Sequence, residues 1–165
     1  MSFHCSVCGE VHDELPDIGS DRPDPWWNVA EEERDRRIEL TSDTCVIDGE
    51  HFFIRGVIQI PVHGRSESFG FGVWVSQKRE NFEAYVDAPE SSEIGPFFGW
   101  LCTGISYYPE DTRLLKTYAH FRGGGLRPVI ELEPTDHPLS IDQREGITLD
   151  KALEIVHFFS DDADA

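Results

Sequence analysis

The sequence has few basic residues and no long apolar run. It contains 14 lysines and arginines against 32 aspartates and glutamates, a formal net charge of −18. Binding to duplex nucleic acid depends on cations that neutralise phosphates, so neither nucleic acid nor an anionic membrane is expected as a partner. No uncharged apolar stretch approaches the roughly 18 residues that span a bilayer, and no basic start precedes an apolar run. We therefore expect a soluble, cytoplasmic protein.

Signatures of common enzyme classes are also missing. The sequence contains no GxSxG, no HExxH and no Cys-His pair in a recognised catalytic setting. The glycine run 123–125 has no Lys-Ser/Thr pair and no helix behind it, so it does not predict a phosphate-binding loop. The sequence therefore names no reaction and no substrate.

The length predicts one domain. A chain of 165 residues can bury a substantial core without splitting into two units. Within a single domain over residues 1–165, we expect a metal knuckle and proline-rich loop over 1–27, an α+β core over 28–159 and an acidic tail over 160–165.

Two cysteines and a histidine stand close to the start of the chain. Cys5 and Cys8 are separated by two residues, Gly9 lets the backbone fold under the sulfurs, and His12 follows four residues after Cys8. These side chains can supply three of the four tetrahedral ligands that zinc prefers. The spacing predicts a zinc knuckle.

The fourth zinc ligand has four candidates, Cys45, Cys102, His4 and His51. We favour Cys45, because its short separation closes a modest loop and a third thiolate completes a known structural ligand set. A site with four protein ligands leaves no position for an activated water, so the predicted role of the zinc is structural.

Two other interpretations of the cysteine pair stay open. Cys5 and Cys8 could form a redox pair, although thioredoxin-like motifs follow a strand and open a helix, and only a few polar residues precede Cys5. They could also be unmodified thiols, with His12 on the surface. Without an export signal, thiols and metal are expected before disulfides.

The acidic residues are concentrated in the two ends of the chain. Residues 10–50 contain 14 acids and 4 bases, and residues 129–165 contain 10 acids and 2 bases, whereas residues 51–128 contain 8 of each. A solvated acidic surface that keeps the protein soluble explains this pattern simply. The alternative that bears on function is a basic protein partner.

Strands are predicted in the middle of the chain. Residues 44–47 and 50–62 flank Asp48-Gly49, which suits a type I′ turn. Residues 69–75 form a third strand in which two glycines leave room for something to lie close. Residues 96–102 predict a buried aromatic strand or a strand with a bulge at Gly99. A second hairpin joins residues 114–122 to 127–133.

Helices are predicted between and after these strands. Asn28 caps a peripheral helix over 29–40, and Ser76 caps one that buries Phe82, Tyr85 and Val86 and ends before Pro89. Two further helices are capped by Asp136, ending at Gly146, and by Thr148. The sum is an α+β fold, an antiparallel sheet of about five or six strands with three or four covering helices and an N-terminal zinc knuckle.

One cluster of polar residues could form a catalytic site. Glu131 and Glu133 share a strand face, and Asp136 could orient His137 for general base work, with Arg55 and His51 as further candidates. The structural alternative is that Asp136 is a helix cap, the glutamates are the solvated face of an edge strand, and His137 precedes a proline that fixes a turn.

A series of motifs runs through nearly the whole chain. They are Cys5-x-x-Cys8-Gly9-x-x-His12, Cys45-Val-Ile-Asp48, Phe53-x-Arg55-Gly56, Ile60-Pro61-Val62, Gly72-Val-Trp74-Val75, Phe98-Gly99-Trp100-Leu101 and Arg127-Pro-x-Ile130-Glu131-Leu132-Glu133-Pro134-Thr135-Asp136-His137-Pro138. Together they are specific, and on them the chain resembles a bacterial family known only as domain of unknown function 2199. The resemblance implies a shared fold but no activity, and it includes Cys45.

The expected function is that of a small acidic zinc-stabilised module that binds a protein, as regulatory or immunity-type proteins do, rather than an enzyme. The alternative is a hydrolase-like enzyme or small-ligand binder that uses Glu131, Glu133, Asp136 and His137. A third possibility is a small-molecule site in the aromatic segment near Trp100.

Overall fold

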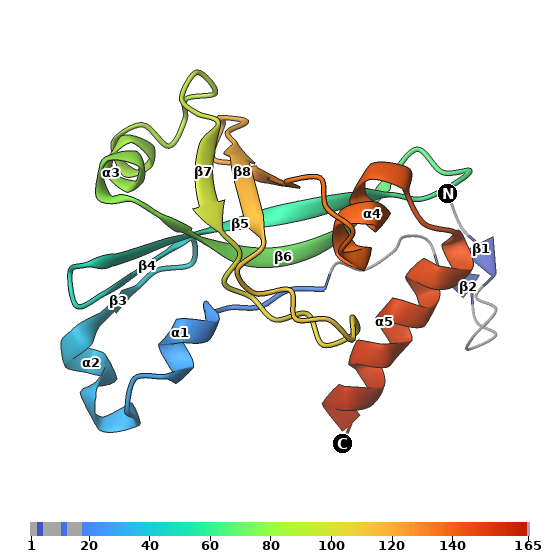
Figure 1. Cartoon of the computed structure of the whole chain (residues 1–165), viewed down its shortest axis with the longest axis horizontal. Helices are drawn as coiled ribbons and strands as arrows, with labels where there is room; N and C mark the ends of the chain where they lie inside the picture. The colour runs from blue at the N-terminus through green and yellow to red at the C-terminus, as the bar shows by residue number, and fades with distance from the viewer. Residues whose placement is uncertain (1–2, 5–10, 13–17, 165) are drawn as a thin grey trace.

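The computed structural model describes residues 3–4, 11–12 and 18–164 (Figure 1). Within these residues it has nine strands and five α-helices. The strands are β1 Phe3–His4, β2 Val11–His12, β3 Ile38–Leu40, β4 Thr44–Ile47, β5 His51–Pro61, β6 Ser68–Gln77, β7 Phe97–Trp100, β8 Lys116–His120 and β9 Val129–Leu132. The helices are α1 Asp24–Trp27, α2 Arg34–Arg37, α3 Arg79–Asp87, α4 Pro138–Glu145 and α5 Leu149–Asp164, with a 3-10 turn η1 at Glu31–Glu33.

The α+β class is confirmed, but the main sheet is mixed rather than antiparallel. Seven strands form it in the order β3-β4-β5-β9-β8-β7, with β6 pairing β5. All pairs are antiparallel except β5 with β9, which meet in parallel at Val57 and Val129. The predicted hairpins are present, and the Asp48-Gly49 turn has positive φ at both residues.

The mixed pairing follows from the way the sheet curls. The bridge between Val75 and Leu101 joins the end of β6 to the residue after β7, so β5, β6, β7, β8 and β9 make a closed circuit. Neighbours in the first four steps run in opposite directions. A circuit of five alternating strands must bring its first and fifth strands together in parallel, which is the β5–β9 contact.

The long β5–β6 hairpin supports the main core. On one face, Ile54, Ile58 and Ile60 of β5 are buried together with four residues of β6, Phe69, Phe71, Val73 and Val75. Leu139 of α4 and Ile155 of α5 belong to the same buried cluster. Figure 1 shows these two helices at the end of the molecule opposite α2.

The other face of the hairpin carries a smaller apolar cluster. Phe53 and Trp74 form its centre, and both cysteines of the described residues belong to it. The full cluster is Val29, Cys45, Ile47, Phe53, Trp74 and Cys102, with Trp26 and Ile38 packed against it.

The room left by the glycines of β6 is filled by the chain itself. Ile18 donates its backbone N–H to the Gly70 carbonyl at 3.0 Å and accepts from Gly72 at 2.6 Å. A Cβ on Gly72 would lie 3.1 Å from the Cα of Gly19. The glycine therefore lets the segment that begins at residue 18 lie flat on β6.

Several predicted helix limits were wrong. The expected helix over 29–40 is divided into η1, α2 and β3, because Ile38 pairs with Ile47 instead of continuing the helix. Helix α3 begins at Arg79 with Lys78 in the N-cap position, not Ser76. Its Phe82 and Tyr85 are buried as predicted, whereas Val86 is exposed.

Among the described residues, no helix combines the length and the apolar character needed to cross a bilayer.

Candidate functional site

Three aromatic side chains are exposed side by side on the outer face of β7 and β8. Phe98, Trp100 and Tyr118 are 39%, 40% and 36% exposed. The ring of Phe98 makes edge contacts with both others, with centroids 5.2 Å from Trp100 and 5.9 Å from Tyr118. We call these three residues the aromatic face. The prediction that residues 96–102 form a buried strand was therefore wrong for Phe98 and Trp100.

The register of β7 explains this exposure. Side chains alternate along a strand, so Phe98 and Trp100 point outward while Gly99 points inward. Pairing is continuous, with Phe98 opposite Tyr118 and Gly99 opposite Thr117, so the predicted bulge at Gly99 is absent. A Cβ on Gly99 would lie 2.1 Å from the Ser76 carbonyl oxygen, which shows that the glycine permits β6 to approach closely.

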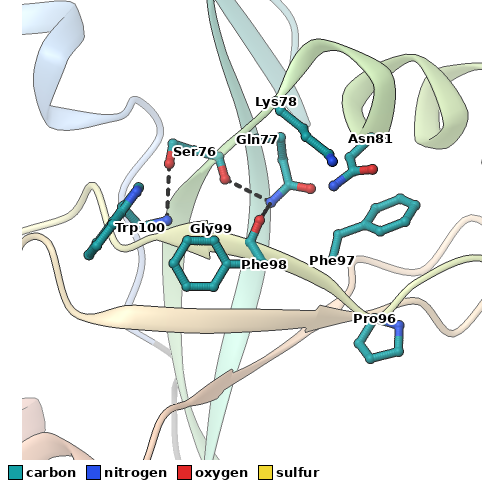
Figure 2. A pocket seen from close by; sticks show the side chains of 9 residues that line it. All are labelled: Ser76, Gln77, Lys78, Asn81, Pro96, Phe97, Phe98, Gly99 and Trp100. Carbon is teal, nitrogen blue, oxygen red and sulfur yellow. Dashed lines mark hydrogen bonds between the residues drawn. The ribbon is translucent and has the colours of Figure 1, made fainter.

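A pocket of about 520 Å³ adjoins the aromatic face (Figure 2). It lies between β7 and the start of α3, and Phe98 and Trp100 belong both to the aromatic face and to the pocket. Its polar lining comes from Ser76, Gln77, Lys78 and Asn81, and its remaining lining is Pro96, Phe97, Phe98, Gly99 and Trp100.

Gln77 holds an unpaired acceptor in this pocket. Its Nε2 donates to the backbone carbonyls of Ser76 at 2.7 Å and Phe98 at 3.2 Å, which fixes the orientation of the amide. The side-chain oxygen Oε1 is buried and has no hydrogen-bond partner within the described chain. Figure 2 shows Oε1 directed away from β7, toward Asn81. Because an unpaired buried acceptor costs free energy, a ligand N–H that reached Oε1 would be favoured.

The aromatic rings can also receive a cation. The Nζ of Lys116 already lies 6.0 Å from the centroid of Trp100, at the edge of the range for a cation–π interaction. A surface that combines exposed rings with an unpaired carbonyl acceptor suits a ligand that carries N–H donors, such as an amide, an amine or a guanidinium group.

The two glutamates of the predicted cluster differ in their surroundings, because Glu131 lies in β9 whereas Glu133 follows Leu132, the last residue of that strand. Glu131 is exposed and lies 3.0 Å from the Nε2 of His120 on β8. Glu133 is half-buried, and its backbone carbonyl accepts from the Ser140 hydroxyl. His120 is thus the histidine that the structure places beside Glu131, and the sequence analysis did not select it.

His137, and not Asp136, is the N-cap of α4. The Nδ1 of His137 accepts from the backbone N–H of Leu139 at 3.0 Å. With Nδ1 as acceptor, Nε2 carries the proton and donates to the carbonyls of Glu110 at 3.2 Å and Asp111 at 3.1 Å. Asp136 is exposed, and α4 begins after His137 because Pro138 suits the first helical turn. Both ring nitrogens of His137 therefore form hydrogen bonds with backbone groups.

Arg55 lies in a different pocket from these groups. That pocket, on the outer face of β5, is also lined by Arg122 and Arg127 and includes none of Glu131, Glu133, Asp136 and His137. Within the described residues, the five side chains of the predicted catalytic cluster therefore do not line one cavity.

Of the predicted zinc ligands, Cys5 and Cys8 lie outside the described residues. The flanking strands β1 and β2 pair antiparallel, with Phe3 opposite His12. Cys45 is fully buried in β4, and burial raises the pKa of its thiol to about 11. The described residues contain no group of three or more potential metal ligands. Cys45 as a zinc ligand stays a prediction, and its thiol would have to lose its proton to bind.

The two acidic ends of the sequence do not gather at one place. Figure 1 shows α2, in the first acidic segment, at one end of the long axis and α5, in the second, at the other. Several acids are also paired, for example Asp48 with Arg37 at 2.8 Å and Asp142 with Lys151 at 2.8 Å. Within the described residues, the acidic side chains of α2 and α5 therefore do not form one face.

These observations define a small α+β protein with a curled mixed sheet and an exposed aromatic site. The chain belongs to the family DUF2199, described as an uncharacterised protein conserved in bacteria, whose sequence model matches residues 4–147. No curated protein and no solved structure matches the chain.

Proposed function

We propose that this protein is a binding module that docks a basic protein through the aromatic face and the adjoining pocket. The observation that carries the proposal is the exposure of Phe98, Trp100 and Tyr118 on two neighbouring strands, with the Phe98 ring in contact with the other two. Large aromatic residues are enriched at the energetic centres of protein interfaces, where they bury much area at little cost in side-chain entropy.

The pocket supports a partner that carries N–H donors. The acceptor Oε1 of Gln77 has no hydrogen-bond partner within the described chain, and Gln77 lines the same pocket as Phe98 and Trp100. An arginine or lysine side chain of the partner can stack on Trp100 and donate to this oxygen. Such a contact would satisfy a buried polar atom that is otherwise unpaired, so it adds affinity and selects the partner.

The charge of the molecule supports a basic partner. A net charge of −18 gives the molecule a negative long-range potential. That potential speeds the association of cationic proteins and weakens as salt is added, because the Debye length falls from about 10 Å at 0.1 M to about 3 Å at 1 M.

A structural zinc completes the proposal. Cys5, Cys8 and His12, with Cys45 as the favoured fourth ligand, would stabilise the N-terminal segment and take no part in binding the partner. The pairing of β1 with β2 on either side of the two cysteines supports this arrangement.

The experiment compares binding to the aromatic face with binding to another exposed tryptophan. The protein and two variants, Trp100→Ala/Tyr118→Ala and Trp27→Ala, are immobilised and exposed to an extract of the native cells, and retained proteins are identified by mass spectrometry. Trp27 is 59% exposed and does not line the pocket, which makes it a matched control. We expect a basic protein to be retained by the wild type and by Trp27→Ala, and to be lost from the double variant.

The purified partner then provides the quantitative test. Removal of the Trp100 and Tyr118 side chains should raise the Kd of the complex by about thirtyfold or more, since a hot-spot residue contributes about 2 kcal/mol. Raising the salt concentration should weaken it further. An acidic partner, a Kd independent of salt, or equal weakening by Trp27→Ala would contradict the proposal.

A further inference from the structure

A second pocket, on the outer face of β5, concentrates positive charge in this acidic protein. Its volume is about 680 Å³. Three arginines from different parts of the chain line it: Arg55 of β5, Arg122 after β8 and Arg127 before β9. It shares no lining residue with the pocket of Figure 2. Any role that it has is therefore separate from the aromatic face.

Arg55 is held firmly at this site. Its side chain is 14% exposed, and its terminal nitrogens donate to the Ser42 carbonyl and to Asp21, each at 3.2 Å. Its Nε is buried and has no hydrogen-bond partner within the described chain. A buried guanidinium N–H without an acceptor is costly, so an additional acceptor from a ligand would be favoured there.

Arg122 and Arg127 are positioned through their Nε atoms. Arg127 donates from Nε to Asp43 at 2.8 Å, and Arg122 donates from Nε to the carbonyl of Arg127 at 2.8 Å. Within the part of the chain that the structure describes, no hydrogen bond occupies the terminal nitrogens of either guanidinium. These nitrogens are the donors with which arginine forms bidentate hydrogen bonds to a phosphate or carboxylate.

Within its described lining the pocket holds more positive than negative charge, although the Glu90 carboxylate lies near Gly125 outside that lining. Asp43 is the one acid in its described lining, against three arginines. Asp21 reaches Arg55 from outside the lining, and its own side chain is 90% exposed, so solvent screens that pair. Positive charge gathered in one concavity attracts anions even on a molecule with a negative net charge.

The remaining lining sets the size and character of the ligand. Ile18, Val57 and Leu126 add apolar wall, and Gly19, Gly72 and Gly125 carry no side chains that would fill the space. The volume lies within the range of about 300–1,000 Å³ found for small-molecule sites and exceeds what a lone inorganic ion needs.

We propose that this pocket binds the phosphate groups of a phosphorylated small molecule. A phosphate offers oxygens in several directions, which suits guanidinium groups that come from three segments of the chain, whereas a carboxylate offers two oxygens in one plane. The apolar wall would contact the rest of the molecule. The carboxylate of Asp43 repels the phosphate electrostatically, but its hydrogen bond also positions Arg127.

Isothermal titration calorimetry tests this proposal. The full chain is titrated at low ionic strength with pyrophosphate, inorganic phosphate and citrate. We expect pyrophosphate to bind more tightly than citrate. Arg122→Gln/Arg127→Gln should weaken pyrophosphate binding at least tenfold. Arg36→Gln is the control for loss of a surface arginine: it removes one positive charge, where the double variant removes two, from a side chain that is 72% exposed and does not line the pocket.

A variant with the opposite effect keeps the test independent of folding. Asp43→Asn removes the opposing charge but leaves an oxygen that can accept from Arg127, so it should tighten pyrophosphate binding several-fold. Absence of pyrophosphate binding by the wild type would overturn the proposal. Three other results would also overturn it. Citrate could bind as tightly as pyrophosphate, or Arg36→Gln could weaken pyrophosphate binding as much as the double variant does. Asp43→Asn could also weaken pyrophosphate binding instead of tightening it.

Discussion

At the scale of single residues, Gly99 and Gln77 together determine how β6 meets β7. The inward face of Gly99 receives the Ser76 carbonyl, and the amide of Gln77 donates to the Phe98 carbonyl of the same strand. Both contacts need a backbone without a side chain at position 99. The exposed positions of Phe98 and Trp100 on either side depend on this arrangement.

The first prediction is that Gly99→Ala destabilises the fold by about 3 kcal/mol, because a Cβ there would meet backbone at 2.1 Å and force the strands apart. Chemical denaturation measures the free energy of unfolding. Gly19→Ala is the control, since its Cβ would find its nearest neighbour, the terminal nitrogen of Arg55, at 3.8 Å. We expect that change to stay within about 0.5 kcal/mol of the wild type. Equal stability of the two variants would contradict the role assigned to Gly99.

At the scale of elements, α4 is anchored by a histidine instead of the expected aspartate. His137 satisfies the Leu139 N–H at the start of the helix and, through its other nitrogen, the carbonyls of residues 110 and 111. One side chain thus joins the helix to a turn that lies far away in sequence. Asp136 makes no such contact in the described chain and remains exposed.

The second prediction follows from this cap. His137→Ala should lower the free energy of unfolding by about 1–2 kcal/mol, the usual cost of a lost N-cap together with its other hydrogen bonds. Asp136→Ala should change it by less than about 0.5 kcal/mol. Thermal and urea denaturation of both variants provide the comparison. A larger loss in Asp136→Ala than in His137→Ala would restore the aspartate as the cap.

Local patterns in the sequence predicted the elements that depend on neighbours in the chain. The Asp48-Gly49 hairpin and the second hairpin around residues 123–125 follow from turn chemistry, and the exposure of Glu131 follows from alternation along the strand. The parallel contact of Val57 with Val129 depends on closure of the whole circuit, and no local pattern contains it.

The candidate site was only partly predictable for a related reason. The aromatic segment near Trp100 was recognised, but its hydrophobicity suggested burial. Alternation along β7 contained the better signal, since Phe97 and Gly99 share the inner face and Phe98 and Trp100 the outer one. The pairing of Tyr118 with Phe98, and of His120 with Glu131, depends on the register between strands and could not be read from one segment.

At the scale of the whole molecule, the two described cysteines share one buried environment. Cys45 and Cys102 are buried in the small cluster around Trp74, and burial raises the pKa of each thiol to about 11. Cys5 and Cys8 belong to the N-terminal segment, outside the described residues. A zinc that joined Cys45 to that segment would connect the start of the chain to the body of the fold.

The third prediction is one tightly bound zinc per chain in protein purified without added metal. Elemental analysis should show it, and Cys8→Ser should lose it together with a lower Tm, because structural zinc binding is coupled to folding. The zinc content of two variants, rather than their stability alone, identifies the fourth ligand. Cys45→Ser should lose the metal, whereas His4→Ala should retain it. Metal-free protein that melts at the same temperature would contradict the prediction.

The junction of β6 with β7 also bears on how the protein behaves at high concentration. An edge strand with free backbone groups can recruit a strand from another molecule and so begin aggregation. In β7 the N–H of Trp100 donates to the Ser76 hydroxyl at 3.0 Å, and the carbonyl of Phe98 accepts from Gln77. Side chains thus occupy two of the groups that a foreign strand would need. These contacts disfavour self-association through β7 while three aromatic rings stay exposed to a partner.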